Sequence, residues 1–145
     1  MRTLITFFLL GIAFCSQGQF VQNKVDRFLT NEQNESWLTT TKLLDEPGQW
    51  KAIKERFFLK RNQNTPIETT MYSPLVVING IPLDIPDELT DNYSNKILNL
   101  LNEDSIDELI ILDKLDNEWT YCKPFSGVII LKVDKKTYKK LFKLK

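Results

Sequence analysis

The chain contains no histidine among its 145 residues. Histidine is the usual general base near neutral pH and the commonest protein ligand of zinc. Its absence excludes the Ser-His and Cys-His pairs that activate the nucleophile in many hydrolases. Acid pairs, lysine and tyrosine remain as catalytic groups, so an enzyme is disfavoured and still open.

Cysteine is also scarce, with Cys15 and Cys122 as the only two. No disulfide scaffold can be built if Cys15 is lost with the N-terminus, as argued below. We expect Cys122 to be a small, partly buried apolar residue, and a bond to another chain is the alternative. No metal-ligand spacing and no cofactor motif stands out, so we predict neither a metal nor a cofactor.

The formal net charge is zero, with 19 basic and 19 acidic residues, so nothing in the bulk charge favours nucleic acid as a partner. The charges are nevertheless segregated. Residues 84–118 hold eleven acids against two lysines, and residues 123–145 hold eight lysines against one acid. The two blocks are either solvated and facing each other, or the basic one contacts an anionic surface such as a membrane.

The N-terminus has the three parts of a secretory signal peptide. Arg2 supplies a positive charge, residues 4–14 are almost entirely apolar, and Ser16-Gln17-Gly18 offers a small-x-small cleavage site. An apolar run of this length is too short to span a bilayer, which needs about 20 residues. We therefore predict a signal peptide over residues 1–18 and a mature protein from Gln19, exported to the periplasm or the extracellular space.

Lipidation at Cys15 is a second interpretation of the same segment. A lipoprotein signal places the modified cysteine directly after a small residue, and Phe14 is bulky at that position. Lipidation would anchor the protein to a membrane.

The mature chain has the length of one domain. We divide it into an N-terminal helical segment, 19–72, and an α+β region, 73–145, which together form one compact domain. Apolar spacing predicts a short helix over 20–30, ended by the polar residues 31–34, and a second helix over 49–58 after Pro47-Gly48.

The second region alternates strands and helices. Residues 75–78 form a strand that enters a tight turn at Asn79-Gly80, and 81–83 is a return arm that Pro82 confines to a sheet edge. Further elements are a long helix over 86–102, strands over 106–112 and 127–133, and a last helix over 135–143. This predicts an α+β fold: a small mixed sheet with one long packing helix, preceded by two short helices.

Three segments of this region match a known sequence pattern in their order and spacing. Residues 74–82 read Pro-Leu-Val-Val-Ile-Asn-Gly-Ile-Pro, residues 102–113 have the pattern Asn-x-x-Ser-Ile-Asp-Glu-Leu-Ile-Ile-Leu-Asp, and 126–130 read Ser-Gly-Val-Ile-Ile after Tyr121. In order and spacing, residues 74–133 resemble the plug domain of TonB-dependent outer-membrane receptors.

The resemblance implies a plug-like module in a bacterial envelope. The departures are Cys122 where the family has glycine after the tyrosine, Ser126 in place of asparagine, and a loop one residue shorter. The chain leaves no room for the receptor's barrel after residue 145, so we expect a stand-alone module whose gating role need not persist.

The candidate binding residues are an aromatic group, Trp119, Tyr121 and Phe125, together with the turn Asn79-Gly80. Aromatic side chains are favoured interface anchors, and a satellite core cluster around Gly127 is the alternative interpretation. Two groups of acidic residues are candidates for cation or acid-base sites, and a solvated rim is the alternative. The groups are Asp104, Asp107 and Glu108, and Asp113, Asp116 and Glu118.

The leading interpretation is a non-catalytic, exported interaction module that binds an envelope protein. The basic C-terminal segment, with Tyr138, Leu141 and Phe142, either packs on the sheet or contacts an anionic membrane surface. The alternatives are a small envelope hydrolase that uses carboxylates, and an antagonist or immunity-type protein that blocks a toxin or hydrolase.

Overall fold

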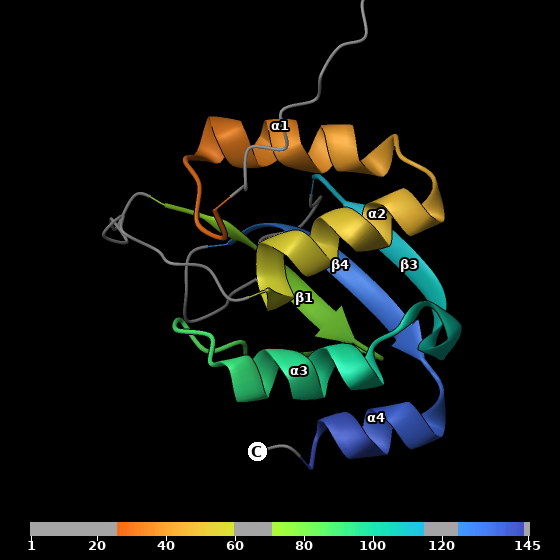
Figure 1. Ribbon diagram of the computed structural model, residues 1–145. Helices are drawn as coiled ribbons and strands as arrows, with labels where there is room; N and C mark the ends of the chain where they lie inside the picture. The colour runs from red at the N-terminus through yellow and green to blue at the C-terminus, as the bar shows by residue number, and fades with distance from the viewer. Residues whose placement is uncertain (1–25, 60–70, 115–124, 144–145) are drawn as a thin grey trace, which may run out of the picture.

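The computed structural model describes residues 26–59, 71–114 and 125–143, which form a mixed sheet with helices packed on it (Figure 1). The strands are β1 (Ser73–Ile78), β2 (Ile81–Pro82), β3 (Ile106–Leu112) and β4 (Phe125–Val133), in the order β2-β1-β4-β3. β1 and β4 run parallel, whereas the other two neighbouring pairs are antiparallel. The predicted α+β fold with a small mixed sheet is confirmed.

The helices are α1 (Asn31–Lys42), α2 (Glu46–Ile53), α3 (Asp91–Leu100) and α4 (Lys135–Leu141), and α2 continues as a π-helical turn, η1 (Lys54–Phe58). A short 3-10 turn, η2 (Glu103–Ser105), joins α3 to β3. Side chains from all four helices share one buried cluster with alternate residues of the strands, so the helices cover the same face of the sheet. No described helix has the length and apolar character needed to cross a membrane.

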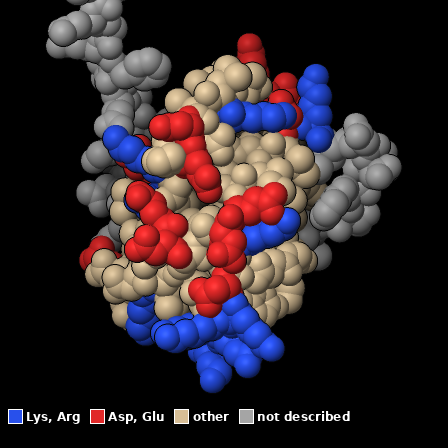
Figure 2. Space-filling view, turned by 90° about the vertical axis from the view of Figure 1, so that its right-hand side faces the viewer, with Lys and Arg blue, Asp and Glu red and all other residues tan. Residues whose placement is uncertain are grey.

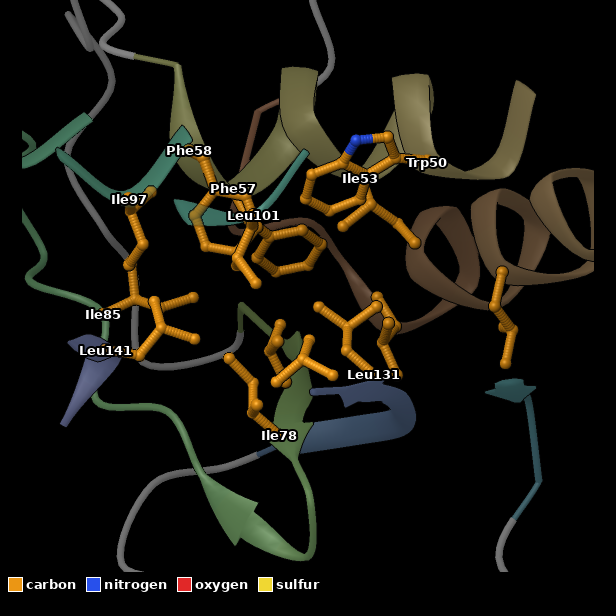
Figure 3. Packing of buried hydrophobic residues seen from close by; sticks show 14 of the residues in the cluster. Trp50, Ile53, Phe57, Phe58, Ile78, Ile85, Ile97, Leu101, Leu131 and Leu141 are labelled. Atoms are coloured by element: carbon orange, nitrogen blue, oxygen red, sulfur yellow. The ribbon is translucent and has the colours of Figure 1, made fainter. Parts of the chain in front are cut away.

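The core lies between the sheet and this helical layer. In Figure 3 the rings of Phe57 and Phe58 lie between the helices and the strand residues Ile78 and Leu131, and all four side chains are fully buried. Each large apolar side chain buried in this way contributes about 1.5–3 kcal/mol relative to its exposed state. The π-helical turn therefore supplies a large share of the apolar contact on this face.

The hairpin at the end of β1 follows the prediction. Asn79 and Gly80 have positive φ angles of 48° and 86°, and β2 pairs back on β1 at the edge of the sheet. Pro82 lacks an N–H and lies in that edge strand, as expected. Gly127 also has a positive φ, 84°, just inside β4.

The first predicted helix is wrong over its described residues. Residues 26–30 are not helical, because Leu29 instead exchanges backbone hydrogen bonds with Tyr72 in an isolated antiparallel bridge. Residues 31–34 begin a helix rather than end one. The Thr30 hydroxyl accepts from the backbone N–H of Gln33, and the Gln33 side chain accepts from the N–H of Thr30, which is a capping box.

The long helix is shorter than predicted at its N-terminus. It begins at Asp91, because the Thr90 hydroxyl accepts a hydrogen bond from the N–H of Tyr93 and so caps the helix. The backbone carbonyls of Ile85 and Pro86 lie in the preceding loop, where both accept hydrogen bonds from the Arg27 guanidinium. This buried arginine ties the start of the described chain to the loop before α3.

Candidate functional site

Asn79, a predicted binding residue, is engaged inside the fold. Its side-chain Oδ1 accepts from the N–H of Val133, and its Nδ2 donates to the carbonyl of Val133, both over 2.9 Å. Its backbone N–H donates to the carbonyl of Leu131 over 3.0 Å. The asparagine amide thus extends the β1–β4 ladder by one step, while Gly80 is exposed beside it.

Phe125, a second predicted binding residue, lies far from that turn. It pairs with Ser73 at the opposite end of the parallel β1–β4 pair, and its half-buried ring packs on a small cluster formed by Leu75, Val77 and Val128. Six residues of extended chain separate Ser73 from Asn79, which corresponds to roughly 20 Å. The structure therefore does not bring Phe125 and Asn79 together. Trp119 and Tyr121 lie outside the described residues.

The acidic residues of the two predicted groups are spread over the surface and do not converge on one site. Glu108 pairs with Lys132 on the neighbouring strand, and Asp113 pairs with Lys42 of α1 over 2.9 Å. The hydrogen bond from Lys42 holds the pKa of Asp113 below its ordinary value. Asp104 and Asp107 are exposed, and within the described ranges no three potential metal ligands converge. Asp116 and Glu118 lie outside the described part of the chain.

The C-terminal helix packs on the core through one side and presents lysines on the other. Leu141 is buried, and Tyr138 and Phe142 lie against the core with their ring centroids 4.7 Å apart. Figure 2 shows acidic side chains over the middle of the face that is on the right in Figure 1, and lysines gathered below them at the level of α4. The expected charge segregation is therefore present on one side of the molecule.

A feature that the sequence did not reveal lies between the helices on this side. Two neighbouring hollows share Trp50 and Glu103 among their lining residues. The larger hollow, about 660 Å³, separates α2 and η1 from the end of α3 and from η2, and the smaller, about 230 Å³, lies between the start of α2 and β3. We call them the larger and the smaller hollow.

Trp50 forms the common wall of the two hollows. Its side chain is 2% exposed, and its ring packs against Phe58 with centroids 6.0 Å apart. The Nε1–H of the indole is buried and has no hydrogen-bond acceptor among the described residues. In Figure 3 this nitrogen is on the edge of the ring turned away from Ile78 and Leu131. An unpaired buried donor costs about 1–3 kcal/mol, so an acceptor supplied by a ligand would recover free energy.

The walls of the two hollows differ in charge. The smaller hollow is lined by two carboxylates and otherwise by apolar or aromatic residues: Glu46, Pro47, Trp50, Glu103, Ile106 and Leu109. The larger hollow has lysines on its α2 side, and the Lys54 ammonium lies over the Trp50 ring at 5.6 Å. A cation is therefore already present at the larger hollow, whereas the lining of the smaller one is only acidic and apolar.

Local structure sets the positions of Glu46 and Glu103. Glu46 is the first residue of α2, after the N-cap Asp45, whose side chain accepts from the N–H of Gly48 over 3.0 Å. Glu103 begins η2, where the Ser105 hydroxyl accepts from the N–H of Asn102 and the N–H of Ser105 donates to the Asn102 carbonyl. An acid in the first turn of an α-helix interacts favourably with the helix dipole, which gives Glu46 a local reason to be acidic.

No family model, no curated protein and no solved structure matches the chain.

The sequence held part of the information for this site. The i, i+3, i+7 spacing of Trp50, Ile53 and Phe57 correctly placed the tryptophan in a helix that packs on the core. It could not show that the indole N–H lacks an acceptor, or that Glu46 and Glu103, far apart in the chain, line the same hollow.

Proposed function

We propose that this protein is an exported, non-catalytic interaction module of the bacterial envelope that binds another protein through the surface around Trp50. The single observation that carries the proposal is the pair of hollows that share this residue. Concave surfaces with an apolar floor, a polar rim and an unsatisfied donor are the usual form of a binding site.

Export is supported by the leader-like N-terminus, and an envelope setting by the resemblance to receptor plug domains. The three segments that carry this resemblance contribute the hairpin β1–β2 and the strands β3 and β4, with α3 between them in the chain. The residues that carry the resemblance have roles in the fold and include no catalytic motif, so the resemblance favours an interaction module over an enzyme.

A hydrolase that uses carboxylates has less support from this site. Glu46, Glu103 and Asp104 are exposed at the rims of the hollows. General-acid chemistry uses a carboxyl group whose burial or close acidic neighbour keeps it protonated near neutral pH. Exposed carboxylates suit the recognition of a charged partner better.

An affinity capture tests the proposal. Tagged protein, residues 19–145, is the bait in a detergent extract of the envelope of its source cell, and mass spectrometry identifies what is retained. A matched control bait carries Ile53→Asp, which places a charge in the buried core and removes the fold. We expect an envelope protein retained by the folded bait alone. A single soluble toxin or hydrolase would favour the antagonist role, and equal retention by both baits would contradict the proposal.

A further inference from the structure

We infer that the smaller hollow binds a basic side chain of the partner, lysine or arginine, carried on an apolar segment whose backbone carbonyl accepts from the indole of Trp50. The inference rests on the proposed function and specifies the chemistry of the partner. Two independent features point to the same ligand: the carboxylates of the hollow, and the unpaired indole N–H of Trp50, a residue that lines it.

The first feature is the charge of the lining. Among the described residues, Glu46 and Glu103 are the only charged ones that line the smaller hollow, and neither has an ion pair or a side-chain hydrogen bond there. The nearby β3 acids contrast with this, because Glu108 and Asp113 are each paired with a lysine. Two unpaired carboxylates on a concave surface create a negative potential that attracts a cation.

The second feature is the indole itself. Trp50 is held by the core on its inner side, so its Nε1–H keeps a fixed direction and cannot turn to find an acceptor elsewhere. A peptide carbonyl satisfies a donor of this kind in one geometry. The flexible Lys54 side chain over the ring can move aside when a ligand approaches.

The apolar part of the lining selects a long side chain. Pro47, Ile106 and Leu109 supply the apolar part of the lining, and Ile106 and Leu109 also pack against the core. These residues offer contact to a methylene stem but not to a charge. Lysine and arginine combine an apolar stem with a terminal cation, so each can cover this floor and reach a carboxylate. A short cation such as a metal ion would leave the apolar floor uncovered.

The protein is labelled with ¹⁵N and expressed from its full-length gene, so that the expressing cell carries out the N-terminal processing. The experiment is a titration of this protein with short peptides. The readout is the indole N–H resonance of Trp50, assigned by its loss in Trp50→Phe. The probes are acetyl-Leu-Arg-Leu-amide, acetyl-Leu-Lys-Leu-amide and acetyl-Leu-citrulline-Leu-amide, and citrulline has the shape of arginine without its charge. We expect the two basic peptides to shift the Trp50 resonance and to bind at least tenfold more tightly than the citrulline peptide.

Paired variants identify the carboxylates. The double variant Glu46→Gln with Glu103→Gln should bind both basic peptides at least tenfold more weakly. These exposed substitutions leave the core intact. Glu88→Gln with Asp107→Asn removes the same charge from exposed residues outside the hollow, and should change affinity less than twofold. Equal weakening by both pairs would overturn the site, because the attraction would then come from the overall charge.

Three further outcomes are decisive. Equal binding of the citrulline and arginine peptides would overturn the preference for a cation, and shifts that spare Trp50 would overturn the role of its indole. Self-association that Glu46→Gln with Glu103→Gln abolishes would overturn the assignment to a partner, because a lysine of a second copy would then fill the hollow. If the captured envelope protein is retained equally by this double variant, the inference fails while the proposed function stands.

Discussion

Arg56 and Asn34 form a buried hydrogen bond, Nη2 to Oδ1 over 2.8 Å, that joins η1 to α1. The same asparagine donates through Nδ2 to the carbonyl of Ser126 at the start of β4, over 2.7 Å. Arg56 also donates twice to the carbonyl of Arg27, and its guanidinium lies 4.4 Å from the Trp37 ring centroid. One polar pair thus connects the helical layer, the sheet and the first described residues.

Asn34→Ala should destabilise the protein by about 2–4 kcal/mol. The substitution leaves the Ser126 carbonyl without its partner and removes one acceptor of a buried guanidinium, and each such loss costs about 1–3 kcal/mol. Urea unfolding followed by tryptophan fluorescence measures the change. Thr39→Ala on the exposed side of α1 is the control and should change stability by less than about 0.5 kcal/mol. Equal stabilities of the two variants would contradict the role of the pair.

The turn at Asn79 gives a graded prediction. Asn79→Asp keeps the acceptor for the N–H of Val133 and loses the donor to its carbonyl, so it should cost about 1 kcal/mol. Asn79→Ala loses both bonds and leaves alanine at a φ of 48° without the side-chain amide that lets asparagine adopt this conformation, so it should cost about 2–3 kcal/mol. Thermal and urea unfolding test the order, and a neutral Asn79→Ala would show that the amide has no structural role.

Two glycines with nearly the same φ separate backbone strain from packing. A Cβ on Gly80, φ 86°, meets no atom within 4 Å, whereas a Cβ on Gly127, φ 84°, lies 3.0 Å from the Leu112 carbonyl oxygen and also overlaps the Leu38 side chain. Gly80→Ala should cost about 1–2 kcal/mol from the backbone alone. Gly127→Ala should cost about 1–3 kcal/mol more, because α1 must move off the sheet. Equal losses would mean that α1 adapts without cost.

Tyr93 makes stability depend on pH in the alkaline range. Burial raises the pKa of its phenol to about 12, with a further rise from Asp84 and an opposing effect of Arg27. The unfolded chain releases this proton near pH 10 and the folded chain near pH 12. The stabilisation is therefore complete below pH 10 and is lost as the pH rises from about 10 to about 12.

Tyr93→Phe has no phenol to titrate, so it isolates this effect from the titration of the lysines. The difference in urea midpoint between the wild-type protein and Tyr93→Phe, measured at half-unit steps from pH 8 to pH 12, should shift in favour of the variant above pH 10. A difference that stays constant over the whole range would show that Tyr93 does not titrate differently in the folded state.

The elements that the sequence predicted correctly depend on short-range chemistry. Asn79-Gly80 supplies positive φ, Pro82 has no N–H for an inner strand, and continuous apolar runs mark β1 and β4. These properties belong to the residues themselves. They hold wherever the segment is placed, and the hairpin and its edge strand followed from them.

The sequence did not predict the start of α1, because Asn34 makes long-range contacts that its neighbours in the chain do not indicate. Its polar neighbours suggested a solvated helix end, yet Asn34 is fully buried because Arg56 and Ser126 satisfy its amide. Ser126 lies 92 residues away in the chain. The capping box of Thr30 and Gln33 was the one local feature that marked the true start. The Trp50 hollows were missed for a similar reason, since α2, η2 and β3 form them jointly.

The most direct test of the account is site-specific photo-crosslinking in the living source cell. A benzophenone amino acid replaces Lys51, which is exposed at the larger hollow, or Ile81, which is exposed on the hairpin at the far edge of the sheet. We expect a crosslink to one envelope protein from position 51 and little or none from position 81. A crosslink from position 81 with none from position 51 would contradict it, and would move the binding surface to the hairpin.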